Sequence, residues 1–230
     1  MALVKFGGGI TEMRGSIAGN VFARNRSGAY VRARTKPVNP NSEAQGFVRS
    51  IIGQLAQHWR TTLDAAERIA WETYAGSVAM KNALGETVFL TGFNHFIRSN
   101  AVFLQSEKAI VEAGPTVLAL PEKDPTFAVA ADGTTKKLTL TLDDELPWAD
   151  DVGAFVQVEM GQPQNPTRNF FAGPWKYTGL VDQAAVLVVE LDPAYTIVDG
   201  QRIFVSARIC RSDGRVSEPM YANCIAETVA

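Results

Sequence analysis

The sequence predicts an α+β chain in which an N-terminal β-hairpin arm and a small helical domain precede an all-β sandwich. Three changes in pattern predict this order. Apolar residues first alternate on either side of a short turn, then recur at helical spacing, and after residue 115 alternate again in short runs. We therefore expect an extended arm and hairpin over residues 1–40, a three-helix domain over 41–114 and a sandwich over 115–230.

The arm is predicted to form a two-stranded hairpin. Strand patterns cover Ser16–Arg24 and Ala29–Thr35, and Asn25–Gly28 between them has turn chemistry. Alternation gives one face of the second strand to Tyr30, Arg32 and Arg34. An isolated hairpin is only marginally stable in water. We therefore expect the arm to lie against its own helices, against a neighbouring subunit, or against both.

Three amphipathic helices are predicted after the arm. The first begins at Ser42, which forms a capping box with Gln45, and runs to about Arg60. Its apolar stripe consists of Val48, Ile51, Ile52, Leu55 and Trp59. The second is capped by Thr62, spans about 64–75 and ends before Gly76, and the third is capped by Thr91 and runs to about Ala113.

From residue 115 onward, apolar residues alternate with polar ones at every second position, as they do in strands. Short runs separated by turn residues at this spacing are typical of a β-sandwich. Gly114-Pro115 marks the domain boundary and 115–125 the linker. The expected strands are Phe127–Ala130, Lys137–Leu142, Ala154–Met160, Phe170–Tyr177, Ala185–Leu191, Arg202–Arg211 and Val216–Cys224.

Charge is distributed unevenly along the chain. Residues 1–60 carry nine Lys and Arg against two acidic residues, whereas residues 115–230 carry nine against sixteen. A basic segment on an acidic body steers association with an acidic partner, either nucleic acid or the acidic face of another copy. No helix concentrates basic residues for a major groove, so we expect no sequence-specific nucleic-acid binding.

The sequence contains no recognisable catalytic, cofactor or metal-binding pattern, and we expect a chain that is not an enzyme. Gly7-Gly8-Gly9 lacks the residues of a phosphate-binding loop. His58 and His95 have no further ligands at metal spacing and are expected to be structural. The acidic runs 143–145 and 150–151 are expected to be solvated rather than to bind Ca²⁺.

The remaining composition restricts the compartment and the redox chemistry. Cys210 and Cys224 are expected to be buried free thiols, although a disulfide between them is the alternative. No apolar run approaches the roughly 20 residues that span a membrane. Met1–Ile10 is too short in its apolar part for a signal peptide, so none is expected.

The first half of the chain resembles a known family. Met13–Phe22, Arg24–Arg32 and Lys36–Asn41 resemble the N-terminal signature of structural proteins encoded by tailed bacteriophages and prophages. Thr91–Phe96, continuing to Asn100, resembles the third helix of the same group. The resemblance covers most of residues 1–105 and implies a component of the virion, assembled in the host cytoplasm.

The second half is similar to fibronectin type III or Ig-like modules. Ile203, Val205, Ala207 and Ile209 alternate before Asp213-Gly214, as in the last two strands of that fold. The sequence departs from the pattern in the second strand, where Leu138, Leu140 and Leu142 occupy the region in which many such modules bury a tryptophan.

These observations lead to three functional hypotheses. The first is a capsid decoration (cement) protein, a homo-oligomer that binds copies of itself and the major capsid protein. The partner contacts would come from Phe22, Arg24, Arg26, Tyr30, Arg32 and Arg34. The second is a tail or neck protein with an Ig-like spacer or adhesion domain. The third is a carbohydrate-binding or hydrolytic surface domain that stacks sugars on Trp148, Trp175, Tyr177 and Tyr195.

Overall fold

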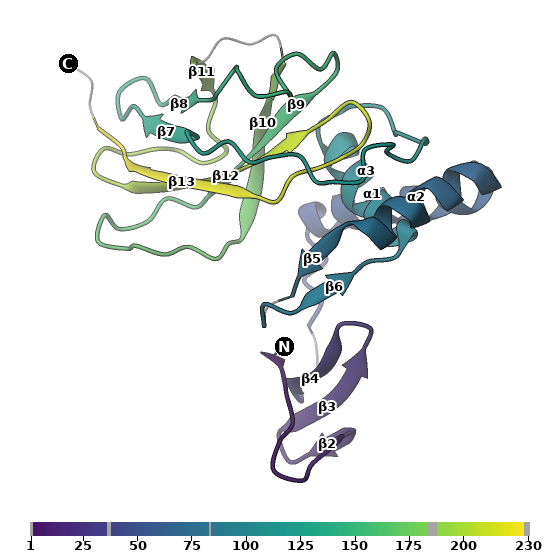
Figure 1. Ribbon diagram of the computed structural model, residues 1–230. Coiled ribbons are helices and arrows are strands. Elements are labelled where there is room, and N and C mark those ends of the chain that lie inside the picture. The colour runs from purple at the N-terminus through teal and green to yellow at the C-terminus, as the bar shows by residue number, and fades with distance from the viewer. Residues whose placement is uncertain (1, 36–37, 83, 184–187, 228–230) are drawn as a thin grey trace.

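The computed structural model describes residues 2–35, 38–82, 84–183 and 188–227 and has a mixed α+β architecture. Three groups of elements follow one another along the chain (Figure 1): an N-terminal sheet, a set of three helices with a short hairpin, and two further sheets that pack on each other. None of the described helices is long and apolar enough to cross a membrane.

The N-terminal sheet consists of four antiparallel strands rather than two. Their order is β1-β4-β3-β2, and their bounds are Ala2–Leu3 (β1), Gly15–Ile17 (β2), Asn20–Asn25 (β3) and Gly28–Ala33 (β4). The single strand expected over Ser16–Arg24 is wrong, because Ala18 has a left-handed φ of 50° and turns the chain between β2 and β3. The turn expected at Asn25–Gly28 is confirmed, since Asn25 pairs with Gly28.

The helical part is built on three helices and one hairpin. They are α1 (Glu43–Thr61), α2 (Ala65–Ser77), α3 (Gly92–Gln105), β5 (Ala79–Lys81) and β6 (Thr87–Phe89). Their core contains Ile51 and Leu55 of α1, Trp71 and Tyr74 of α2, and Phe96 of α3. A Cβ on Gly92 would lie 2.7 Å from the backbone nitrogen of Glu72, so the start of α3 approaches α2 as closely as a glycine allows.

The helix boundaries and caps differ from the expected ones in several places, and α2 continues through Gly76 to Ser77 instead of ending before that glycine. Asp64, not Thr62, caps α2, and it forms a reciprocal capping box with Glu67. At Ser42 only half of the expected box is present, because the hydroxyl accepts from the Gln45 amide without a return bond. The helix α3 ends at Gln105 instead of Ala113, because Glu107 adopts a left-handed φ of 58° and the Lys108 amide bonds back to the carbonyl of Phe103.

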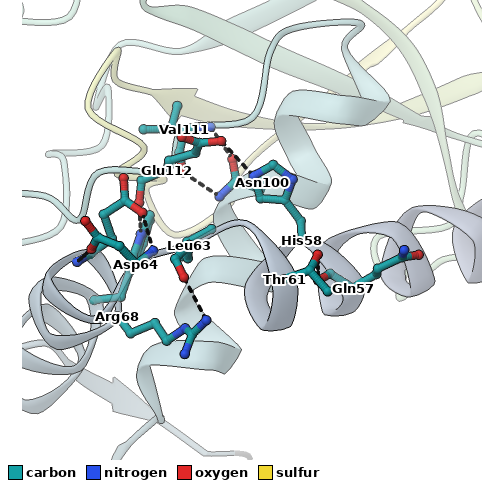
Figure 2. Close-up of polar contacts among 11 residues, drawn as sticks. Gln57, His58, Thr61, Leu63, Asp64, Arg68, Asn100, Val111 and Glu112 are labelled. Atoms are coloured by element: carbon teal, nitrogen blue, oxygen red, sulfur yellow. Dashed lines mark hydrogen bonds and ion pairs between the residues drawn. The ribbon is translucent and has the colours of Figure 1, made fainter.

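The segment after α3 is held against the helices by side chains (Figure 2). The side chain of Asn100 accepts from the Val111 amide at 2.7 Å and donates to the Val111 carbonyl at 3.1 Å. The ring of His58 lies 2.9 Å from the carboxylate of Glu112. The indole of Trp71 donates to the Glu112 carbonyl at 2.8 Å. Residues 111–112 therefore belong to the helical packing, although they form no helix.

Two sheets enclose the largest core. One has the order β10-β9-β12-β13 and the other β11-β8-β7. The strands are β7 (Ala128–Ala131), β8 (Leu138–Thr141), β9 (Phe155–Gly161), β10 (Trp175–Asp182), β11 (Val188–Leu191), β12 (Arg202–Cys210) and β13 (Met220–Ile225). Alternate residues of β8, β9 and β12 meet in one cluster, with Leu140, Val158 and Val205 completely buried. The expected sandwich is present, while its likeness to Ig or fibronectin type III modules stays a prediction.

Two of the sandwich strands are displaced from their expected positions. The strand β10 starts at Trp175 rather than Phe170, directly after a proline that has no amide hydrogen to donate. The strand β13 starts at Met220 rather than Val216 for the same reason, because Pro219 precedes it. Part of the expected strand Ala185–Leu191 lies outside the described residues, and its described part forms β11.

The helix α3 joins the helical part to the sandwich. The guanidinium of Arg98 donates to the carbonyls of Val216 and Ser217, both at 2.7 Å. The ring of Phe103 meets that of Phe155 edge to face at 5.1 Å. Residues on several sides of α3 are therefore buried, Phe103 against the sandwich and His95 against Tyr74 of α2. Within the described chain the division into domains at Gly114-Pro115 stays a prediction.

Candidate functional site

The six residues expected to contact a partner lie on the N-terminal sheet but do not share one face. Residues opposite each other in paired strands point to the same side of a sheet. Phe22 pairs with Val31 and Arg24 with Ala29, so these lie on one face. Tyr30 and Arg32 of β4 point to the other face, with Arg26 in the turn and Arg34 beyond the strand end. The sequence assigned a common face only to Tyr30, Arg32 and Arg34, and the pairing of β3 with β4 decides where the others lie.

The N-terminal sheet has no buried core. None of the described residues 2–35 is buried, and none belongs to a hydrophobic core cluster. Arg24, Arg26, Arg32 and Arg34 are all exposed. Figure 1 shows the sheet set apart from the helices and the sandwich, next to the β5–β6 hairpin. The alternative in which the arm folds into the helical core is therefore wrong for this chain alone.

The side chain of Lys5 links the N-terminal sheet to the rest of the chain. Its ammonium lies 2.7 Å from the carboxylate of Glu86 in the segment between β5 and β6. The hydrogen bond from Lys5, with a second from Asn82, holds the pKa of Glu86 below its ordinary value. Both charged groups are exposed to solvent, and exposed ion pairs contribute little to stability.

The first half of α1 presents an apolar surface to solvent. Ile51 and Leu55 are buried as expected, but Val48 is 50% exposed and Ile52 is 45% exposed. Phe47, next to Val48, is 52% exposed. The expectation that the whole stripe packs within the chain is wrong: Val48 precedes the buried part of α1, and Ile52, between the buried Ile51 and Leu55, lies on a side of the helix that is left exposed. This apolar surface follows the N-terminal arm directly in the sequence.

A groove lined by aromatic rings lies on the outer face of the sheet β10-β9-β12-β13. Its volume is about 490 Å³, and its rings come from Phe170, Phe171, Trp175, Phe204 and Tyr221. Phe171 stacks on Phe204 with ring centres 5.6 Å apart and meets Trp175 edge to face at 5.0 Å. A Cβ on Gly161 would overlap the ring of Phe171, so this glycine lets the ring lie against the sheet. We call this the aromatic groove.

Amide and guanidinium groups stand at the rim of the aromatic groove. Asn169 and Asn223 line it, and their side-chain oxygens accept from Arg202 at 3.2 and 3.4 Å. In the described part of the chain the amide NH₂ groups of these two asparagines have no protein acceptor. They are therefore available as donors to a bound molecule.

A second hollow lies on the other side of Tyr221. Its volume is about 400 Å³, and Lys81, Arg98, Lys123 and Arg208 line it together with one carboxylate, that of Glu218. Lys123 pairs with Glu218 at 2.7 Å, whereas Arg208 forms no ion pair with any described residue. We call this the cationic pocket. Burial, opposed by the charge of Arg208, raises the pKa of the neighbouring Glu159 on the same sheet face.

The other groups singled out from the sequence have structural roles. Burial raises the pKa of Cys210 to about 12 and that of Cys224 to about 11, and both thiols are free. Among the described residues no His, Cys, Asp and Glu cluster could hold a metal ion. Burial alone would raise the pKa of Asp151, but hydrogen bonds from Ser212 and Arg211 outweigh it and lower the pKa. Asp151 thus ties two loops together instead of being solvated.

The aromatic residues proposed to stack sugars are not grouped as expected. Trp148 lies in the sandwich core at 4% exposure, so it cannot meet a ligand. Only Trp175 of that set lines the aromatic groove, and its partners were missed because they come from separate strands and a loop. The available signal was the alternation of side chains along β12 and β13. Val205 and Met220 belong to the core, so their chain neighbours Phe204 and Tyr221 point to the outer face of the sheet.

No protein-family model and no curated protein matches this sequence.

Proposed function

We propose that this chain is a non-enzymatic structural protein of a tailed-bacteriophage particle, and that it decorates the capsid and stabilises it by joining neighbouring subunits. The observation that carries the proposal is the absence of any buried residue in the described N-terminal residues 2–35. A sheet without a core gains its stability by packing on something else. In a particle, that surface would be another copy or the major capsid protein.

The edges of the N-terminal sheet support the same proposal. Its edge strands β1 and β2 have two and three residues, and all three residues of β2 are exposed. Unpaired backbone groups at a sheet edge can add to a strand of a partner. Ile17, which is 56% exposed at this edge, would be covered by such an addition.

The charges and the α1 surface complete the argument. The exposed arginines of the N-terminal sheet suit an acidic partner, and residues 115–230 of each copy are rich in carboxylates. Exposed Phe47, Val48 and Ile52 offer apolar area beside this basic segment. A contact between the N-terminal arm of one copy and residues 115–230 of another would therefore combine the burial of apolar side chains with attraction between opposite charges.

The test reverses the charge of the arm and measures incorporation into particles. We expect the variant with glutamate at positions 24, 26, 32 and 34 to fold but not to enter particles, because like charges would face each other at the contact. A smaller variant combines Arg32→Glu with Arg34→Glu. Its control combines Arg60→Glu with Lys136→Glu, which reverses the charge of two exposed residues outside the arm. Normal incorporation of the arm variants, or equal loss in the matched control, would refute the role of the arm.

A second test separates assembly from folding. Deletion of residues 1–40 should change the free energy of unfolding by less than about 1 kcal/mol, because the arm contributes only exposed contacts such as Lys5–Glu86. Leu55→Ala, in the helical core, should cost about 2–5 kcal/mol in the same urea titration. The deletion should nevertheless abolish incorporation. Imaging of particles with a label on the sandwich then distinguishes the head from the tail or neck.

A further inference from the structure

The outer face of the sheet β10-β9-β12-β13 carries two adjoining hollows of different chemistry. The aromatic groove and the cationic pocket share Tyr221 as a common wall. Phe204 and Arg208 alternate with core residues along β12, so the two hollows open on the same side of the sheet. This surface takes no part in the contacts assigned to the N-terminal arm.

The aromatic groove leaves large ring surfaces uncovered. Tyr221 is 64% exposed, and Phe170 at the groove edge is 72% exposed. Aromatic rings gathered around a preformed hollow, with a few polar groups at its rim, are typical of a binding site for a small or extended ligand. The ring-on-ring contacts of Phe171 with Phe204 and Trp175 hold the groove in shape before any ligand arrives.

The groups at the rim restrict the ligand to one with flat apolar faces and polar edges. The amide groups of Asn169 and Asn223 can donate to hydroxyl or carbonyl oxygens beside the rings. A pyranose ring has this combination, since its C–H face covers an aromatic ring while its hydroxyls point outward. A purely aliphatic ligand would leave these amides unsatisfied.

The cationic pocket adds a requirement for negative charge. Arg208 lines the pocket, is only partly buried, and has no ion-pair partner among the described residues. A carboxylate on the ligand would pair with the part of this guanidinium that faces the pocket, in a charge-assisted hydrogen bond. The basic arm of a second copy does not fit this pocket, because its arginines would meet Lys81, Lys123 and Arg208.

We infer that this sheet face binds an acidic oligosaccharide, with one sugar ring stacked in the aromatic groove and the carboxylate of a neighbouring sugar in the cationic pocket. A nucleic-acid strand also combines planar rings with negative charge. It fits less well, because the basic lining residues are confined to the cationic pocket and the residues that line the aromatic groove are uncharged, so phosphates on both sides of a stacked base would lack partners there. The inference is independent of the proposed role in the particle.

The test is a glycan array with neutral and uronic-acid-containing oligosaccharides, probed with the full chain and followed by calorimetry on the ligands retained. We expect Tyr221→Ala to weaken binding about tenfold, the loss of roughly one ring contact. The matched control is Phe47→Ala, which removes a similarly exposed ring from α1. Both residues are more than half exposed, so both variants should unfold at the wild-type urea concentration.

A second variant separates the two hollows. Arg208→Gln should weaken the binding of acidic oligosaccharides about tenfold and leave neutral ones unchanged. The inference is overturned if no oligosaccharide is retained, if Tyr221→Ala and Phe47→Ala bind equally, or if Arg208→Gln weakens neutral and acidic ligands alike. Tighter binding of single-stranded oligothymidylate than of any oligosaccharide would also overturn it and indicate a nucleic-acid site.

Discussion

The buried histidine of α3 makes the stability of this protein depend on pH. His95 is completely buried, and neither ring nitrogen has a hydrogen-bond partner among the described residues. Its ring meets that of Tyr74 edge to face at 5.1 Å. Burial, with a smaller contribution from the charge of Arg98, lowers the pKa of His95 from 6.5 to about 4. The folded protein therefore holds this imidazole neutral where the unfolded chain binds a proton.

The direction and size of the effect follow from this difference. The unfolded chain takes up the proton as the pH falls below 6.5, whereas the folded chain resists it until about pH 4. Stability is thus complete above pH 6.5 and is lost as the pH falls. The loss in unfolding free energy is about 1.4 kcal/mol by pH 5.5 and about 3 kcal/mol by pH 4.

The assay is urea unfolding at pH 7, 5.5 and 4 for the wild type and for His95→Leu, which fills a similar volume without titrating. The carboxylates affect both proteins alike, so the difference between the two free energies isolates His95. Relative to pH 7, the wild type should lose about 1.4 kcal/mol more unfolding free energy than the variant at pH 5.5, and about 3 kcal/mol more at pH 4. A difference that does not change with pH would refute the reasoning.

The remaining predictions concern packing and thiol chemistry. Gly92→Ala should lower the free energy of unfolding in urea by about 1–3 kcal/mol, because the new methyl group meets the backbone of α2. The control Gly46→Ala has open space around it in α1, so it should be neutral or stabilise the protein by up to about 1 kcal/mol. Cys210 should resist maleimide at pH 7 and react once urea unfolds the chain, with Cys224 reacting slowly in the native state, because burial raises the pKa of both thiols. Rapid native labelling of Cys210, checked by mass spectrometry, would contradict this placement.

Several local features of the fold were predictable from short stretches of sequence. Ser42 and Thr91 accept hydrogen bonds from backbone amides at the helix starts, as their position before apolar stripes indicates. The alternating leucines of β8 predicted a strand with one buried face, and Leu138 and Leu140 are completely buried. These features depend on neighbours within a few residues, so the sequence pattern contains the information.

The errors arose where distant residues or single backbone angles decide the structure. The left-handed residues Ala18 and Glu107 end elements that propensity alone would continue. The exposure of Val48 and Ile52 depends on which side of α1 the rest of the chain covers, and the burial of Trp148 depends on a loop that turns into the sandwich core. The spacing of apolar residues does not determine which of them other elements bury in the folded chain.

The sequence by itself determined the order of arm, helices and sandwich, the uneven charge, and most strand and helix positions, because periodicity and turn residues act locally. Only the tertiary structure decided which surfaces stay uncovered. The pairing of β3 with β4 separates the expected contact residues onto two faces, and the sheet order β10-β9-β12-β13 brings Trp175, Phe204 and Tyr221 to one groove. Such sites depend on strand register and on long-range packing, in which residues far apart in the chain become neighbours.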